Sequence, residues 1–191
     1  MLTVVSLCAG LTSIRFSLVG EWEVAVLAIV LAGIMDFLDG RLARLLKGVT
    51  KFGAQLDSLA DFLSFGVAPV ILLYEWTLAE LGGIGWIVVL SYPVCCALRL
   101  ARFNTAPEPG RRPDWASSFF VGVPAPAAAG MAILPLVASF ELGWEAFRWP
   151  LLVAPYLLTI SVLMVSRLPT VSFKRMRVRR EYVLPLLVVV G

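Results

Sequence analysis

The stretch DFLDGRLARLLKGVTKFGAQLDSLAD, from Asp36 to Asp61, places four aspartates in or beside long apolar segments. They are Asp36, Asp39, Asp57 and Asp61. On insertion scales, a carboxylate at the centre of a bilayer costs roughly 2.5–3.5 kcal/mol. We therefore expect these side chains to face a compensating group rather than lipid, and the rest of the chain to be arranged around them.

The chain as a whole is strongly apolar. Of its 191 residues, 60% are hydrophobic, and the mean hydropathy is +0.90. This composition is typical of a membrane protein with several spans. The absence of histidine excludes Ser-His and Cys-His nucleophiles and histidine-based zinc sites.

Six apolar runs are close to the ~20 residues that a bilayer core requires. They are Leu2–Leu18, Val24–Leu42, Leu56–Tyr74, Ile84–Ala101, Ser117–Phe140 and Pro150–Ser166. A seventh segment begins at Tyr182 and is too short to span as given. The sequence therefore predicts an all-α membrane bundle with six core helices and a seventh begun, forming one domain over residues 1–191 that is truncated at its C-terminus.

The charges of the connecting loops alternate in sign. Gly20–Glu23, Glu75–Gly83 and Glu141–Trp149 together contain six acids and one basic residue, Arg148. The opposite connections carry arginine and lysine, including the run KRMRVRR at Lys174–Arg180. Because positively charged loops stay in the cytoplasm, we expect the N-terminus and the aspartate stretch to lie on that side.

Helical spacing brings the aspartates together on two faces. At about 100° per residue, Asp36 and Asp39 share a sector of about 100° with Gly40 and Ala43. Asp57 and Asp61 share a similar sector with Gly53, Ala60 and Ser64. A short loop joins the two helices, so we expect an antiparallel hairpin whose acidic faces meet at the cytoplasmic boundary.

Four converging carboxylates would repel one another unless cations compensate them. Two divalent cations balance the formal charge, and oxygen ligands without histidine favour Mg²⁺ or Mn²⁺. Basic residues beside the site suit phosphate groups; they are Arg41, Arg44, Lys47 and Lys51. The alternative is that the acids form salt bridges with these residues and only stabilise the hairpin.

The pattern Asp36-x2-Asp39-Gly40-x2-Ala43-Arg44-x8-Gly53-x3-Asp57-x3-Asp61 resembles the full signature of the CDP-alcohol phosphatidyltransferases. All eight signature positions match at the family's spacing. The resemblance implies a membrane-embedded, typically dimeric helical enzyme. Such an enzyme displaces CMP from a CDP-linked lipid with an alcohol acceptor.

The resemblance also implies a role for each signature residue. Asp36, Asp39 and Asp57 would hold one divalent cation, and Asp36, Asp57 and Asp61 would hold the other. Asp61 would also be the general base. The nucleotide site would be lined by Gly40, Ala43, Arg44 and Gly53, with Asp39 close to it.

Four stretches, the first of which overlaps the end of the signature, resemble the serine-accepting members of this family in bacteria and archaea. They are DSLADFLSFGVAP (Asp57–Pro69), ALRLARFN (Ala97–Asn104), VGVPAPAAAG (Val121–Gly130) and SRLPTVSFK (Ser166–Lys174). This likeness implies that CDP-diacylglycerol and L-serine give phosphatidylserine and CMP. Serine carries a carboxylate that needs a cation, so we assign Arg99 and Arg102 to that carboxylate or to the lipid phosphate. Their alternative role is to anchor the chain by positive charge on the cytoplasmic side.

Several alternatives stay open at this point. The acceptor could be glycerol 3-phosphate, an inositol phosphate or choline. Intramembrane acids also occur in ion-coupled transporters, and a non-catalytic scaffold is a third possibility. The expected setting is a homodimer in a bacterial or archaeal cell membrane, with the site facing the cytoplasm and no nucleic acid partner.

Overall fold

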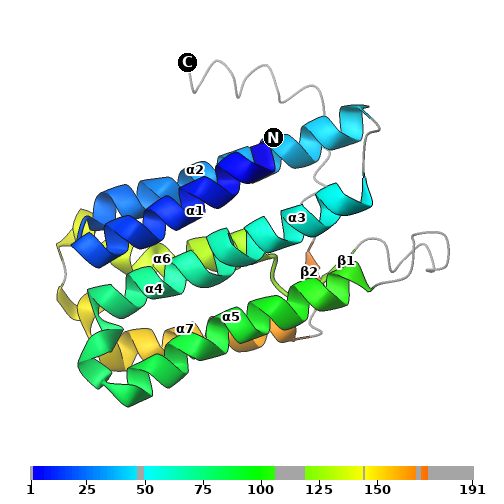
Figure 1. Ribbon diagram of the computed structural model, residues 1–191. Coiled ribbons are helices and arrows are strands. Elements are labelled where there is room, and N and C mark those ends of the chain that lie inside the picture. Colours follow the sequence, from blue (N-terminus) through cyan, green and yellow to red (C-terminus); the bar gives the residue numbers. More distant parts are fainter. Residues whose placement is uncertain (1, 47–49, 106–118, 144, 167–168, 172–191) are drawn as a thin grey trace, which may run out of the picture.

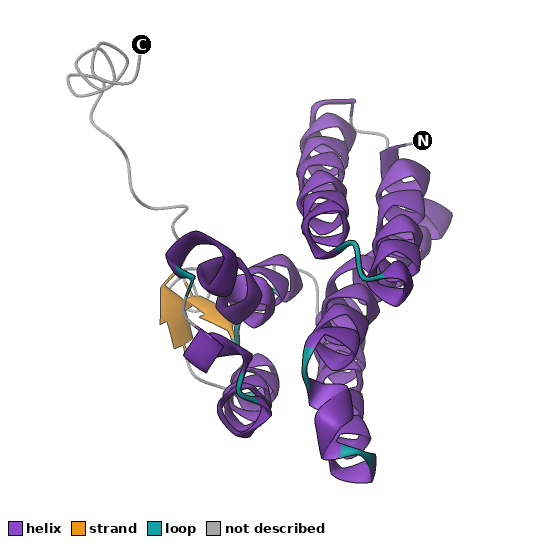
Figure 2. Ribbon diagram, turned by 90° about the vertical axis from the view of Figure 1, so that its left-hand side faces the viewer, coloured by secondary structure: helices purple, strands orange, loops and turns teal. Residues whose placement is uncertain are grey.

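The computed structural model describes residues 2–46, 50–105, 119–143, 145–166 and 169–171 (Figure 1). Within these ranges the chain is helical apart from two short strands. The α-helices are α1 (Leu2–Val19), α2 (Trp22–Leu46), α3 (Lys51–Asp61), α4 (Ala68–Trp76), α5 (Gly83–Asn104), α6 (Ala125–Leu142) and α7 (Pro150–Val165). The strands β1 (Phe119–Val121) and β2 (Pro169–Val171) pair antiparallel. Figure 2 shows this strand pair and the N-terminal helix on opposite sides of the bundle.

Among the described residues, four helices are long and apolar enough to cross a membrane. They are Leu2–Val19, Phe52–Trp76, Gly83–Asn104 and Ala125–Leu142. The helix α7 is apolar but shorter, and α2 is outside this set because of its charged residues. The chain is therefore a helical protein with four candidate membrane spans. The segment from Tyr182 and the basic run Lys174–Arg180 lie outside the described residues.

The third candidate span is one helix made of three parts. The π-helical segment η1 (Phe62–Val67) joins α3 to α4, and the N–H of Ala68 donates to the carbonyl of Leu63. Pro69 follows directly and has no N–H to donate, so the backbone ladder loses one hydrogen bond at this point. Wide turns of this kind occur often at functional sites, and this one follows Asp61.

The predicted start of the fifth span is wrong. We expected a helix from Ser117, but α6 begins at Ala125, after the strand β1. Gly122 has a φ of +79°, and a Cβ there would lie 2.5 Å from the carbonyl oxygen of Met164. Glycine therefore allows the chain to turn at close range to α7. Pro124 is extended and ends this turn.

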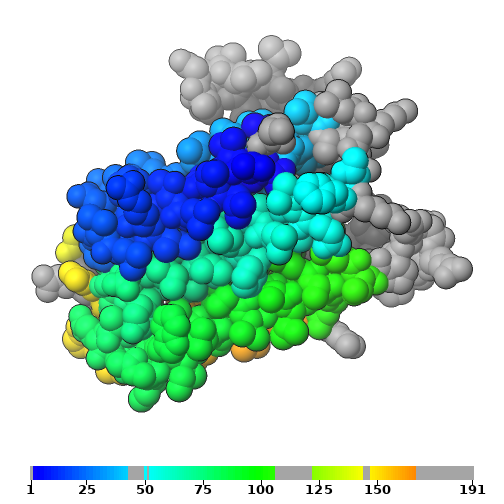
Figure 3. Space-filling view, viewed as in Figure 1, coloured from blue at the N-terminus to red at the C-terminus, as the bar shows by residue number. Residues whose placement is uncertain are grey.

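The helix α1 packs closely against α2 and against the third span (Figure 3). Its buried face is made of small residues, namely Ser6, Ala9, Gly10, Ser13 and Ser17. The hydroxyl of Ser64 on η1 donates to the carbonyl of Ser6 at 3.0 Å. The hydroxyl of Ser6 donates to the carbonyl of Ala32 on α2, also at 3.0 Å. Small residues of this kind let membrane helices approach closely, so α1 is fixed to both helices that carry the aspartates.

Replacing Gly10 with alanine should destabilise this contact. A Cβ at Gly10 would lie 2.5 Å from Oγ and 2.9 Å from Cα of Ser64. We expect a loss of about 1–3 kcal/mol in the free energy of unfolding, measured as a lower melting temperature in detergent. Gly130→Ala is the matched control, because a Cβ at Gly130 meets nothing within 4 Å. Equal melting temperatures for the two variants would contradict the close contact.

Candidate active site

Three of the four predicted acids converge at one end of the bundle. One carboxylate oxygen from each of Asp36, Asp57 and Asp61 lies within 4.8 Å of the other two. Asp36 is on α2, and Asp57 and Asp61 are one turn apart on α3. All three side chains are partly buried. The α2–α3 hairpin therefore brings acids from two helices to a single point.

Asp39 has a different neighbour. Its Oδ2 accepts a hydrogen bond from the hydroxyl of Thr3 on α1. It is not part of the group formed by Asp36, Asp57 and Asp61. Thr3 could not be predicted from the sequence, because a single threonine near the start of an apolar helix gives no sign of a partner 36 residues away.

The three-carboxylate cluster fits a divalent cation. Oδ1 of Asp61 is buried and receives no hydrogen bond within the described part of the chain. Buried polar atoms normally have a partner, and three close carboxylates need positive charge between them. The ligand atoms that the three carboxylates offer are all oxygens, which hard cations such as Mg²⁺ and Mn²⁺ prefer.

The two predicted arginines lie in different surroundings. Arg99 on α5 is partly buried and interacts electrostatically with Asp61. Its Nε is buried, and no described residue accepts a hydrogen bond from it. Arg102 is exposed, and its Nη1 donates to the carbonyl of Val165 at 3.1 Å. Since Val165 ends α7, Arg102 caps that helix and complements its dipole.

The predicted nucleotide residues lie around the α2–α3 connection. Gly40 is exposed on α2, and Gly53 is in the first turn of α3, where its N–H donates to the side chain of Thr50 at 3.0 Å. Ala43 and Arg44 belong to the last turn of α2, but their side chains lie outside the described part. The backbone thus brings these positions to the acidic end of the hairpin.

One further contact beside the site was not predicted. Nδ2 of Asn104, at the end of α5, donates to Oγ of Ser58 at 3.0 Å. Ser58 directly follows Asp57 in the sequence, so this bond ties the helix of Arg99 to the helix of the acids. The stretch ALRLARFN contains Asn104, but its spacing does not reveal which helix it contacts.

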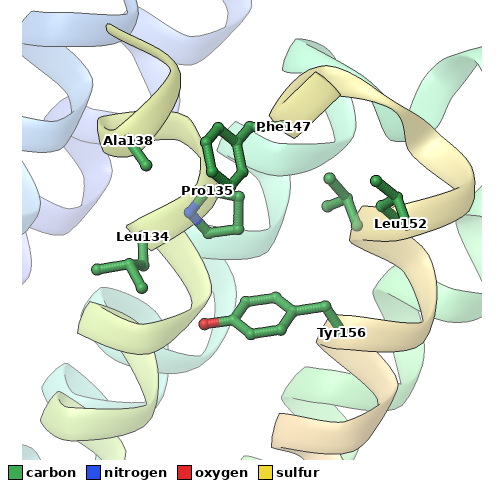
Figure 4. A pocket seen from close by; sticks show the side chains of 7 residues that line it. Leu134, Pro135, Ala138, Phe147, Leu152 and Tyr156 are labelled. Carbon is green, nitrogen blue, oxygen red and sulfur yellow. The ribbon is translucent and has the colours of Figure 1, made fainter. Parts of the chain in front are cut away.

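A separate apolar pocket lies at the other end of the bundle, between α6 and α7 (Figure 4). Its lining includes Leu134, Phe147 and Leu152. The hydroxyl of Tyr156, which also lines it, donates to the carbonyl of Met131 at 2.8 Å. Without a charged side chain among its lining residues, this pocket does not provide the chemistry that the acidic cluster provides.

A family model and several named proteins are similar to this chain, and they indicate the same family. The sequence model of the CDP-alcohol phosphatidyltransferase family matches residues 1–178. The chain is 44% identical over 183 residues to a Mycobacterium leprae protein named CDP-diacylglycerol–serine O-phosphatidyltransferase, covering 95% of this chain and 60% of the relative. A Bacillus subtilis protein of the same name is 36% identical over 175 residues, which are 92% of this chain and 90% of the relative.

An archaeal relative extends the comparison. The archaetidylserine synthase of Methanothermobacter thermautotrophicus is 34% identical over 168 residues, covering 87% of this chain and 66% of the relative. The chain thus spans about 60–66% of the length of the mycobacterial relatives and most of the Bacillus one. The family match extends over both aspartate helices and Arg99. The acidic cluster and these similarities together show that the chain belongs to the CDP-alcohol phosphatidyltransferase family.

Proposed function

We propose that this protein transfers the phosphatidyl group from CDP-diacylglycerol to L-serine, giving phosphatidylserine and CMP. The observation that carries the proposal is the cluster of Asp36, Asp57 and Asp61 beside Arg99 in an apolar helical bundle. The names of the bacterial and archaeal relatives support serine as the acceptor. Glycerol 3-phosphate, an inositol phosphate and choline are the competing acceptors.

The proposed setting is a single membrane domain over residues 1–191 in a homodimer. Six core spans would be formed by α1, α2, the helix Phe52–Trp76, α5, α6 and α7, with a further segment from Tyr182. Acidic connections at one end of the bundle and arginines at the other support a cytoplasmic active site. A hydrogen bond from the Thr77 side chain to the carbonyl of Arg148 joins two of the acidic connections.

The proposed cation sites use all four aspartates. Asp36, Asp57 and Asp61 would hold one Mg²⁺ or Mn²⁺, and Asp36, Asp39 and Asp57 would hold a second. When bound, the cations neutralise charge on the diphosphate as CMP departs. The nucleotide would be lined by Gly40, Ala43, Arg44 and Gly53.

In the proposed reaction, Asp61 acts as the general base. Its carboxylate accepts the proton of the serine hydroxyl. The serine oxygen then forms a bond to the phosphorus attached to diacylglycerol, and the bond from that phosphorus to the oxygen of CMP breaks. Arg99 holds the carboxylate of serine through a charged hydrogen bond. Phosphatidylserine stays in the bilayer, and CMP leaves to the aqueous side.

The experiment that tests this function measures CMP release by the purified protein in mixed micelles with CDP-diacylglycerol and Mn²⁺. We expect release with L-serine and not with glycerol 3-phosphate, an inositol phosphate or choline. Equal release without serine would contradict the acceptor assignment. Asp57-dependent ion flux in liposomes without CMP release would favour a transporter, and a melting temperature insensitive to Mn²⁺ would favour a scaffold.

Substitution of Arg99 and of Arg102 should have different effects on the KM for serine. We expect Arg99→Gln to raise the KM for serine at least about tenfold, because hydrogen bonds to charged groups contribute about 1.5–3 kcal/mol. Arg102→Gln should leave this KM unchanged and lower the melting temperature slightly, because it removes the cap of α7. A raised KM for CDP-diacylglycerol in Arg99→Gln would instead assign Arg99 to the lipid phosphate. Equal effects on serine in both variants would contradict the separation.

A further inference from the structure

We propose that Thr3 is a positioning residue for the metal site, acting through its hydrogen bond to the carboxylate of Asp39. Thr3 belongs to α1, which carries none of the four acids. Its hydroxyl donates to Oδ2 of Asp39 on α2. The inference rests on the cation-binding part of the proposed function and does not depend on which alcohol is the acceptor.

Thr3 lies on the face of α1 that is held against its neighbours. Residues at spacings of three and four share a helix face, and Thr3 is followed on this face by Ser6 and Gly10. Ser6 bonds to the backbone of α2 and accepts from Ser64 on η1. Gly10 leaves no room for a Cβ against Ser64. These contacts hold this face of α1 against α2 and η1, and the hydroxyl of Thr3 lies on it beside Asp39 of α2.

A hydroxyl donor at this place suits a carboxylate that must bind a cation. Thr3 engages one of the two oxygens of Asp39 and thereby selects the orientation of the carboxylate. Because threonine is neutral, it brings no positive charge to compete with the cation, as an arginine or lysine partner would. Partners of this kind typically change metal affinity about 10- to 100-fold when they are removed.

The bond also explains why Asp39 is separate from the other three acids. Asp39 follows Asp36 by three residues on α2 and is close enough to repel Asp36 and Asp57, so without a donor its carboxylate could turn further toward the cluster. With Thr3 as its donor, Asp39 stays at the side of the cluster that faces α1. Thr3, a neutral residue on a helix without acids, thus determines where the carboxylate of Asp39 lies relative to the other three acids.

The test uses Mn²⁺ alone, without lipid or nucleotide, on the detergent-purified protein. The readout is the Mn²⁺ concentration that gives half of the maximal rise in melting temperature. We expect Thr3→Val, which removes the hydroxyl and keeps the shape, to raise this concentration at least about tenfold. Thr3→Ser, which keeps the hydroxyl, should match the wild type. Thr3→Ala provides the same comparison if the valine variant does not fold.

Thr12→Val is the matched control. Thr12 is exposed on the same helix, and its hydroxyl donates to the carbonyl of Cys8 within α1 at 2.7 Å. Its substitution should leave the Mn²⁺ response unchanged. The inference is overturned if Thr3→Val responds like wild type, if Thr12→Val is impaired equally, or if Mn²⁺ does not stabilise the wild type. Absence of serine-dependent CMP release, with the expected Mn²⁺ pattern intact, would overturn the proposed function alone.

Discussion

Asp61→Asn is expected to lower serine-dependent CMP release by about 100- to 10,000-fold, the range of general base catalysis. Asparagine has the same shape as aspartate but cannot take a proton. Oδ1 of Asp61 receives no hydrogen bond from the described residues, and the amide of asparagine can keep the side-chain hydrogen bond with Asp36. We therefore expect the variant to stay folded, with a melting temperature close to that of the wild type.

The measurement should use saturating Mn²⁺, so that weaker cation binding does not lower the rate. Glu80→Gln is a suitable control, because Glu80 is an exposed acid in a connection at the other end of the bundle. Full activity of Asp61→Asn would contradict the assignment of Asp61 as the base. A loss of activity at low Mn²⁺ that saturating Mn²⁺ restores would assign Asp61 to cation binding alone.

Removing the cation should have the second large effect, on both activity and melting temperature. The direction of the change in melting temperature depends on whether Asp36 is present. Chelation of divalent ions should abolish CMP release and lower the melting temperature of the wild type. A ligand present at 100 times its dissociation constant stabilises the folded state by about 2.7 kcal/mol. Asp36 contributes to both proposed cation sites, so Asp36→Ala should lose both the activity and the stabilisation by Mn²⁺.

Without the cation, the wild type should no longer be more stable than Asp36→Ala. The metal-free wild type holds three carboxylates within 4.8 Å of one another, and Asp36→Ala removes one of the repelling charges. We expect the metal-free variant to melt at or above the temperature of the metal-free wild type. A variant that keeps the wild-type response to Mn²⁺ would contradict the role of Asp36. Glu80→Gln, which lies far from the cluster, should follow the wild type in both conditions.

The aspartates could be located from the sequence because their arrangement depends on local geometry. Asp57 and Asp61 are one helical turn apart, and the short α2–α3 connection leaves little choice in how Asp36 meets them. The structure brings three of the four predicted acids together and leaves Asp39 outside this group. Helical geometry alone predicts only a cation site. The expected phosphatidyl transfer comes from the spacing of the family signature.

The parts that could not be predicted depend on contacts between distant segments. Spacing of three residues cannot show that Arg99 faces Asp61 while Arg102 reaches the end of α7. Ser64, expected on the acidic face, lies within the π-helical turn, and the sequence does not show that its hydroxyl donates to α1. The apolar residues before Ala125 resemble a membrane helix in composition, but the close approach of Gly122 to α7 ends that pattern.

The π-helical turn also divides the third span into two halves of unequal local stability. Most of α4 is buried, namely Ala68, Pro69, Val70, Leu72, Leu73 and Trp76. In α3, by contrast, Phe52 and Leu59 are 78% and 62% exposed. Elements with few buried contacts open at lower free energy than the core. We therefore expect the backbone amides of α3 to exchange hydrogen faster than those of α4, so that the turns carrying Asp57 and Asp61 form the less stable half of this span.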